Sequence, residues 1–250
     1  MGRITETVKV LIIVNVIFFI GSLTLQGTSF SLFAFWFPYN DNFHFWQILT
    51  YMFMHSHQGI SHIFFNMLLL FLLGSDLEYR IGQKKFLFLY FSAGFGALAL
   101  QLLFYYLYFI PGYQAFIDAG FVKNEILEFM REERYNTAVL QFTDQDTVTN
   151  MYRSYYSHMV GASGAVSGVI AAFGILFWNE KIYLLFIPFP IKAKYLMLLY
   201  FVPDIMGAIT STSFYGVSNI AHWAHIGGAV IGFITMWYWK KNSFNQHRWY

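Results

Sequence analysis

The chain has 250 residues, of which 57% are hydrophobic and 11% are charged, and its net charge is +2 at pH 7. A soluble domain of this length needs more charged side chains to cover its surface, so the composition excludes an ordinary soluble protein and predicts a multi-span membrane protein. The absence of cysteine excludes disulfides, a thiolate nucleophile and a cysteine-based metal site.

Six apolar stretches of the chain predict membrane-spanning helices. Such a helix needs about 20 predominantly apolar residues, and each stretch comes close to that length. Together they predict an all-α, polytopic membrane helix bundle that forms a single domain over residues 1–250. The expected spans are residues 8–25, 60–77, 86–110, 159–178, 195–210 and 219–239.

Positive charges lie before or at the start of the first expected span, between the second and third, between the fourth and fifth, and after the sixth. They are Arg3, Lys9, Arg80, Lys84, Lys85, Lys181, Lys192, Lys194, Lys240, Lys241 and Arg248. Because lysine and arginine gather on the cytoplasmic side of membrane proteins, six spans with this pattern place both termini in the cytoplasm. We expect an integral protein of a bacterial inner membrane.

The outer connection between the third and fourth spans, residues 112–157, is long. Its apolar residues Ile126, Leu127, Phe129 and Met130 alternate with glutamate and arginine. This pattern predicts an amphipathic helix that rests on the membrane or caps the bundle.

Four polar residues lie at similar depth, near the outer ends of three spans. His62 and Asn66 are four residues apart and share one face of the second span. Ser163 begins the fourth span, and His225 lies near the start of the sixth. A serine hydroxyl needs a base to become a nucleophile, so His225 would take its proton and return it to the leaving amine. The backbone N–H of Ser163 and the side chains of Asn66 and His62 could donate to an oxyanion.

Glycines beside these residues predict that the fourth and sixth spans touch. Gly164 and Gly168 form one small-residue face, and Gly228 and Gly232 form another. Faces of this kind allow helix backbones to approach closely in membranes. If the two faces meet, the hydroxyl of Ser163 and the imidazole on the sixth span come within hydrogen-bonding range.

The chain resembles the rhomboid intramembrane serine proteases. The matching motifs are Met54-His55, His62-Ile63-Phe64-Phe65-Asn66, Glu78 with Gly82, Gly161-Ala162-Ser163-Gly164 and Ala224-His225-Ile226-Gly227-Gly228. The resemblance implies a catalytic dyad of Ser163 and His225 without an acidic third member. It also implies an oxyanion hole formed by Asn66, His62 and the Ser163 backbone. The expected substrates are single-span membrane proteins in the lipid bilayer, cut near their outer ends, with no metal, organic cofactor or nucleic acid involved.

Two positions depart from the family pattern. Trp46-Gln47 stands where the family usually has Trp-Arg, which implies a weaker polar anchor in the first outer loop. Ser167 stands where the family often has an aromatic ring that stacks under the histidine, which implies that His225 is less restrained.

Further residues around the dyad are expected to support it. Gly161 and Gly164 flank the nucleophile, Ser167 lies one turn beyond it, and His222 lies one turn before His225 as a structural hydrogen-bonding group. Asp204, in the fifth span, could complete a triad with the histidine, but we expect it to lie too deep and to make a structural hydrogen bond.

Two other functions remain open at this point. One is a catalytically silent rhomboid-like protein that binds transmembrane helices without cutting them. The other is a transporter that uses its histidines, although such proteins commonly show internal repeats or paired broken helices, and this sequence shows neither.

Overall fold

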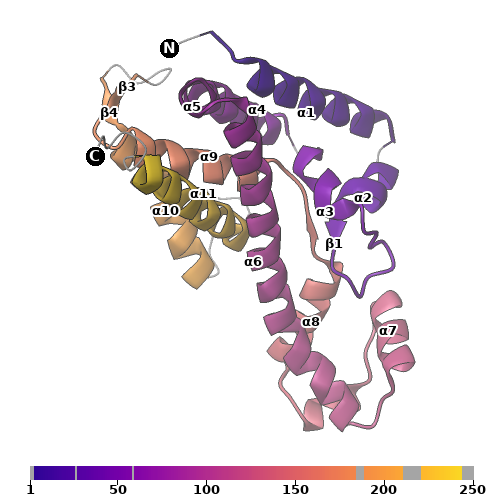
Figure 1. The fold of residues 1–250 in the computed structure, drawn as a ribbon. Coiled ribbons are helices and arrows are strands. Elements are labelled where there is room, and N and C mark those ends of the chain that lie inside the picture. The colour runs from indigo at the N-terminus through magenta and orange to yellow at the C-terminus, as the bar shows by residue number, and fades with distance from the viewer. Residues whose placement is uncertain (1–2, 26, 58, 184–188, 211–220, 244–250) are drawn as a thin grey trace.

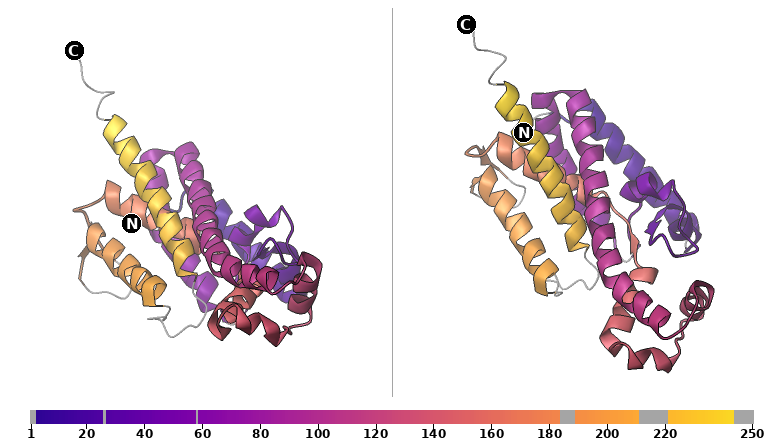
Figure 2. Two further views of the ribbon diagram at one scale, coloured as in Figure 1. Left: turned by 90° about the horizontal axis from the view of Figure 1, so that it is seen from below. Right: turned by 60° about the horizontal axis from the view of Figure 1, so that its bottom comes forward.

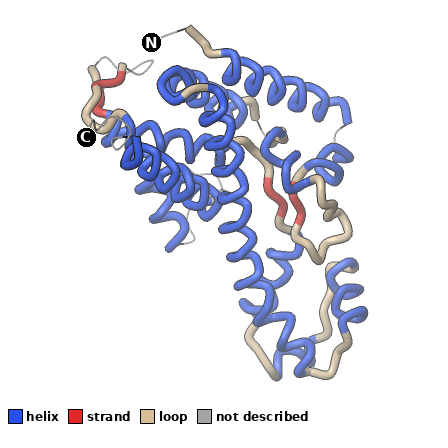
Figure 3. The backbone as a smooth tube through the Cα atoms, viewed as in Figure 1, coloured by secondary structure: helices blue, strands red, loops and turns tan. Residues whose placement is uncertain are grey.

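The computed structural model describes residues 3–25, 27–57, 59–183, 189–210 and 221–243. These residues form a mostly helical bundle, with two very short antiparallel strand pairs beside it (Figure 1, Figure 3). The expected fold class is therefore confirmed in its helical character.

Helices dominate both halves of the chain. The first half consists of α1 (Glu6–Leu25), α2 (Gly27–Phe33), β1 (Phe35–Trp36), α3 (Gln47–Thr50), the 3-10 turn η1 (Tyr51–Phe53), α4 (Ser61–Leu69), the π-helical turn η2 (Leu70–Gly74), α5 (Ser75–Ile81) and α6 (Gln83–Asp118). The second half consists of α7 (Lys123–Arg131), the 3-10 helix η3 (Thr137–Gln141), α8 (Gln145–Tyr156), β2 (His158–Met159), α9 (Ser163–Leu176), β3 (Lys181–Ile182), β4 (Ile191–Lys192), α10 (Ala193–Thr210) and α11 (His222–Ser243). Strand β1 pairs with β2, and β3 pairs with β4.

Among the described residues, four helices are long and apolar enough to cross a membrane. They are α1, the continuous helix Ser61–Ile81, α6 and α10. The expected fourth span is a shorter apolar helix, because α9 covers only Ser163–Leu176. Helix α11 covers the expected sixth span from His222 onward. Residues 219–220 and Arg248 lie outside the described residues.

Helix α6 is longer than expected. It continues through Pro111 to Asp118 and has 36 residues, which at 1.5 Å per residue is about 54 Å, well beyond the roughly 30 Å of a hydrocarbon core. The helix therefore continues into the outer connection expected over residues 112–157, whose first residues are helical. Tertiary packing explains the difference: a Cβ added at Gly112 would meet Met151 Cβ of α8 at 2.7 Å, so the two helices are in close contact there.

The outer segment that follows has its own apolar core. That core consists of Phe37, Phe109, Ala115, Phe116, Ile126, Met130, Val139, Val148, Met151 and Tyr155. The expected amphipathic helix is present as α7, and its apolar residues Ile126 and Met130 are fully buried in this core. Helix α7 thus shares this core with the extended end of α6, and Figure 1 shows both at the same end of the molecule. The amphipathic pattern is satisfied by protein contacts.

An ion pair joins this outer segment to the first outer loop. Arg131 Nε and Nη2 donate to the two carboxylate oxygens of Asp41 at 2.6 and 2.9 Å. These hydrogen bonds hold the pKa of Asp41 below its usual range. The pair is exposed, so it contributes little to stability but fixes the direction of approach of α7.

The buried carboxylate of Glu78 ties α1 to α5. It accepts hydrogen bonds from the Thr5 hydroxyl and from the backbone N–H groups of Thr7 and Val8, at 3.3 and 3.1 Å for the latter two. The first N–H groups of a helix lack intrahelical partners and carry a partial positive charge. Glu78 satisfies them, and so holds the first helix against the bundle.

The first outer loop is anchored by Gln47, which is fully buried. Its Nε2 donates to the carbonyls of Ser31 and Asn42 at 2.8 and 2.7 Å. Its Oε1 accepts from the backbone N–H groups of Trp36 and His44 at 3.3 and 3.1 Å. A neutral amide supplies both donors and acceptors, so Gln47 anchors the loop backbone through four hydrogen bonds.

We predict that Gln47→Leu destabilises the protein by about 2 kcal/mol or more, because each buried backbone group left without a partner costs about 1–3 kcal/mol. The thermal midpoint in detergent measures the effect. Gln114→Leu, which changes an exposed glutamine at the end of α6, is the matched control and should change stability by less than about 0.5 kcal/mol. Equal midpoints for the two variants would contradict the assigned role of Gln47.

Candidate active site

Ser163 is the first residue of α9, directly after a sharp turn. Gly161 has φ +118°, a backbone conformation that residues with a Cβ rarely adopt. Its N–H donates to the Tyr51 carbonyl at 3.0 Å. The turn directs the chain from strand β2 into the helix. The backbone N–H of Ser163 belongs to the first turn, where N–H groups have no intrahelical partner and are available to an anion.

His225 faces Ser163 from the first turns of α11. Its Nε2 lies 3.0 Å from Ser163 Oγ, which is hydrogen-bonding distance. The two residues expected to form a dyad, which are 62 positions apart in the chain, are thus brought together by α9 and α11.

Glycine contacts set this distance. A Cβ added at Gly228 would overlap the carbonyl oxygen of Gly164, and one added at Gly232 would overlap that of Gly168. The expected contact between the two small-residue faces is therefore confirmed. Helix α6 packs against the same seam, because a Cβ at Gly164 would overlap Ala97. Figure 2 shows α6, α9 and α11 adjacent at the centre of the bundle.

His62 borders the same space from α4. A Cβ at Gly161 would meet His62 Nε2 at 3.0 Å and Ser163 Oγ at 3.6 Å, so the imidazole and the hydroxyl flank one glycine. The Ser56 N–H lies 3.5 Å from His62 Nδ1 and is placed to donate to it. A neutral imidazole that accepts at Nδ1 carries its proton on Nε2. His62 can therefore donate into the space beside the serine.

Asn66 lies one turn further along α4 and is buried. Its Nδ2 donates to the His62 carbonyl at 2.9 Å. An amide nitrogen carries two hydrogens, and this contact engages one of them while it fixes the side chain on the same helix face as the imidazole.

An aromatic ring reaches His225 from an unexpected direction. Tyr200 of α10 has its ring centroid 6.2 Å from that of His225, at an interplanar angle of 40°. Ser167, which is fully buried, donates to the Ser163 carbonyl at 2.8 Å and lies 3.3 Å from Tyr200 Oη. Position 167 bears no ring, but the ring of Tyr200 lies beside His225 from another helix.

Asp204 also departs from expectation. Its Oδ2 lies 3.0 Å from His225 Nδ1, and its Oδ1 lies 2.7 Å from His222 Nδ1. The expectation that it is too deep to reach the histidine is wrong. Asp204 lies six residues before the end of α10, about 9 Å at 1.5 Å per residue. His222 is a hydrogen-bonding group, as expected.

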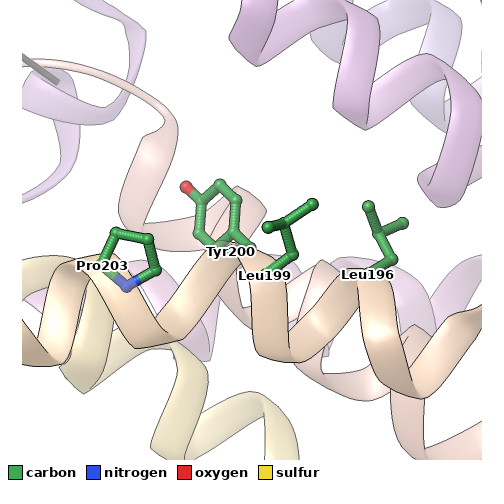
Figure 4. Close-up of a pocket in the computed structure, with 4 residues that line it drawn as sticks. All are labelled: Leu196, Leu199, Tyr200 and Pro203. Carbon is green, nitrogen blue, oxygen red and sulfur yellow. The ribbon is translucent and has the colours of Figure 1, made fainter. Parts of the chain in front are cut away.

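A cavity of about 290 Å³ lies on one side of α10, lined by Leu196, Leu199, Tyr200 and Pro203. Figure 4 shows Leu196, Leu199 and Tyr200 projecting from the same side of this helix. Tyr200 belongs both to the cavity and to the surroundings of the histidine, so the cavity adjoins the site. Within the described ranges, no group of three or more histidine or acidic side chains could hold a metal ion.

Comparison with known proteins identifies the family to which these motifs belong. The family model described as "Rhomboid domain" matches residues 42–121 and 136–242. These two ranges contain His62, Asn66, Ser163 and His225, whereas the unmatched residues between them contain α7. An uncharacterised rhomboid protein of Schizosaccharomyces pombe, named as mitochondrial, is 26% identical over 210 residues, which cover 79% of this chain and 52% of that protein. The chain thus spans about half the length of this curated relative.

We predict that Gly228→Ala destabilises the protein by about 1–3 kcal/mol, the usual cost of an overpacked core. The added methyl group meets the backbone of Gly164, which cannot rotate away as a side chain could. Thermal unfolding in detergent measures the change.

Gly21→Ala is the matched control, because nothing lies within 4 Å of a Cβ at that position. In the exposed interior of α1, alanine should be neutral or stabilising by up to about 1 kcal/mol. If both alanine variants unfold at the wild-type temperature, the α9–α11 seam is looser than described.

Proposed function

This chain belongs to the rhomboid family, and from that premise we propose that it is an intramembrane serine endopeptidase that cleaves single-span membrane proteins near the outer membrane face. The observation that carries the proposal is the 3.0 Å contact between His225 Nε2 and Ser163 Oγ. A nucleophile within reach of a base, beside unengaged N–H donors, is the arrangement that acyl transfer requires.

In the proposed reaction, Ser163 Oγ attacks the carbonyl carbon of the scissile peptide bond while its proton passes to His225 Nε2. The carbonyl oxygen becomes an oxyanion. The intermediate then collapses, the C–N bond breaks, and the amine leaves with the proton from His225. Water, deprotonated by the same imidazole, releases the acyl group from the serine and restores both residues.

Three donors would serve the oxyanion in this proposal. They are the backbone N–H of Ser163, the Nε2–H of His62 and the second amide hydrogen of Asn66. Removal of one donor of this kind raises the barrier by about 2.7–4 kcal/mol. The Ser56 N–H at His62 Nδ1 supports this role for His62, because it favours the tautomer with its proton directed toward the serine.

We propose that six helices span the membrane: α1, Ser61–Ile81, α6, α9, α10 and α11. The 14 residues of α9 cover about 21 Å, less than the hydrocarbon thickness of about 30 Å. Ser163, at the start of α9, would therefore lie below the outer surface, where the non-helical residues just before it admit water. Irregular backbone at such a depth is tolerated where it lines a cavity.

Both termini would lie on one side, the cytoplasmic side of a bacterial inner membrane. Figure 2 supports this arrangement, since the start of α6 and the end of α11 lie at one end of the bundle and α7 and α8 lie at the other. The mitochondrial location in the name of the fungal relative is a statement about that protein.

The apolar cavity on one side of α10 favours substrates with apolar side chains near the cleaved bond. Leu196, Leu199 and Pro203 offer apolar contacts beside Tyr200, which adjoins His225. A transmembrane segment that unwinds locally would supply both apolar side chains for this surface and an accessible peptide bond for the serine.

We predict that a fluorophosphonate probe labels the wild-type protein in detergent and does not label Ser163→Ala. The probe reacts only with a serine that a base has activated. Cleavage of a panel of single-span model proteins, with product masses measured, should show the same dependence. Equal labelling of the two proteins, or of neither, would favour a silent helix-binding protein or a transporter.

Tyr200→Leu should slow labelling roughly threefold to tenfold, because an aromatic contact of this kind contributes about 0.5–1.5 kcal/mol. Tyr200→Phe keeps the ring beside His225 and should stay within about threefold of wild type. The initial labelling rate measures both variants, and a Tyr200→Leu protein that reacts as fast as Tyr200→Phe would show that the ring does not restrain the imidazole.

A further inference from the structure

We propose that Asp204 is a third, positioning member of the site, which holds His225 in the tautomer and orientation that accepts the Ser163 proton. This inference rests on the proposed function and departs from the acid-free dyad that the family resemblance implies. It is carried by the contacts of one carboxylate with two histidines across the interface of α10 and α11.

The tautomer follows from the donor and acceptor roles. An ionised carboxylate can only accept hydrogen bonds, so the 3.0 Å contact between Asp204 Oδ2 and His225 Nδ1 places a proton on Nδ1. In a neutral imidazole the other nitrogen then carries the lone pair. That nitrogen, Nε2, is the one that lies 3.0 Å from Ser163 Oγ. Asp204 therefore fixes the base in its reactive form.

His222 fixes the carboxylate in turn. Its Nδ1 lies 2.7 Å from Asp204 Oδ1, so both oxygens of the carboxylate have a partner. The His222 ring lies directly against Gly207, where an added Cβ would meet its Nε2 at 2.5 Å. With one oxygen held by His222, the second is directed at His225.

The position of Asp204 in the membrane supports a function. Its side chain is 2% exposed, in a helix with the length and composition of a span. An ionisable side chain in such a place is costly to bury and marks a functional site by default. If Asp204 only joined α10 to α11, its contact with His222 would be enough. Its other contact, with His225, aligns the imidazole that faces the serine.

The protons in this arrangement can be followed one by one. The serine proton moves to His225 Nε2 as the nucleophile attacks, and the Nδ1 proton stays on the imidazole, hydrogen-bonded to Asp204. The carboxylate stays ionised and stabilises the imidazolium by its charge. No proton is transferred to Asp204, so it acts through His225 and does not touch the substrate.

The rate of fluorophosphonate labelling, measured against pH on the full chain in detergent, tests the proposal. Asp204→Asn should lower the plateau rate at least about tenfold; the corresponding amide costs about 10⁴-fold in a soluble serine protease. The pH at half of the plateau should also fall, because the imidazolium loses a neighbouring negative charge. Asp204→Glu should recover part of the rate, and Asp118→Asn, an exposed residue at the end of α6, should match wild type.

The pH profile separates positioning from a structural tie. Among the described residues, the titratable groups around His225 are Asp204 and Tyr200 from α10, His222 from its own helix and His62 from α4. His222→Asn removes the contact of His222 with Asp204 but leaves the negative charge of Asp204. It should therefore slow labelling while shifting the pH profile less than Asp204→Asn does. If Asp204→Asn is folded and keeps the wild-type rate, or is slower with an unchanged profile, the proposal is overturned.

Histidine NMR with ¹⁵N-labelled rings tests the same inference without any activity, so its outcome is independent of the proposed protease function. The signals of His225 are assigned by their loss in His225→Gln. In the wild-type protein at neutral pH, His225 should carry its proton on Nδ1, and in Asp204→Asn this tautomer should lose its dominance. A wild-type His225 with its proton on Nε2 would overturn the role of Asp204, whereas absent labelling with the Nδ1 tautomer present would overturn only the function.

Discussion

The close approach of α9 and α11 is the constraint on which the site depends. Gly164 and Gly228 have no Cβ, so the backbones of α9 and α11 approach closely. This approach brings the hydroxyl of Ser163 within hydrogen-bonding distance of the imidazole of His225. In a lipid environment, helix association relies on packing and polar contacts, since burial of apolar surface brings little gain there. The seam of small residues therefore supports both the packing of the central helices and the contact between Ser163 and His225.

Helix α10 is held in a different way. Four of its residues are buried, Ala193, Asp204, Gly207 and Ala208, and much of the rest is exposed. Its contacts with the site are polar and aromatic: the carboxylate between two histidines, and the phenol beside Ser167. The bundle thus combines a tightly packed pair of helices, which bear the serine and the histidine, with a more loosely packed helix that directs side chains at them.

Local patterns predicted much of this arrangement. The glycine spacing on the fourth and sixth spans predicted their contact, because it repeats along each helix. The serine and histidine motifs predicted which side chains meet. Asp204 was misplaced because Pro203 made the limits of its span uncertain, and its depth depends on where α10 ends. Tyr200 has no recognisable spacing from Ser163, since its approach depends on how two helices pack. The extension of α6 through Pro111 was missed because contacts with α8 outweigh the local preference of proline.

The glycine seam also decides where this chain is free to vary. At Gly164, Gly168, Gly228 and Gly232 any larger side chain collides with backbone or with a packed neighbour, so these sites cannot drift without moving the nucleophile. Leu199, beside the cavity on α10, is 65% exposed and carries no such restriction. If the proposed protease function holds, a change in substrate preference would therefore arise on α10, at residues whose replacement leaves the packing of α9 against α11 intact.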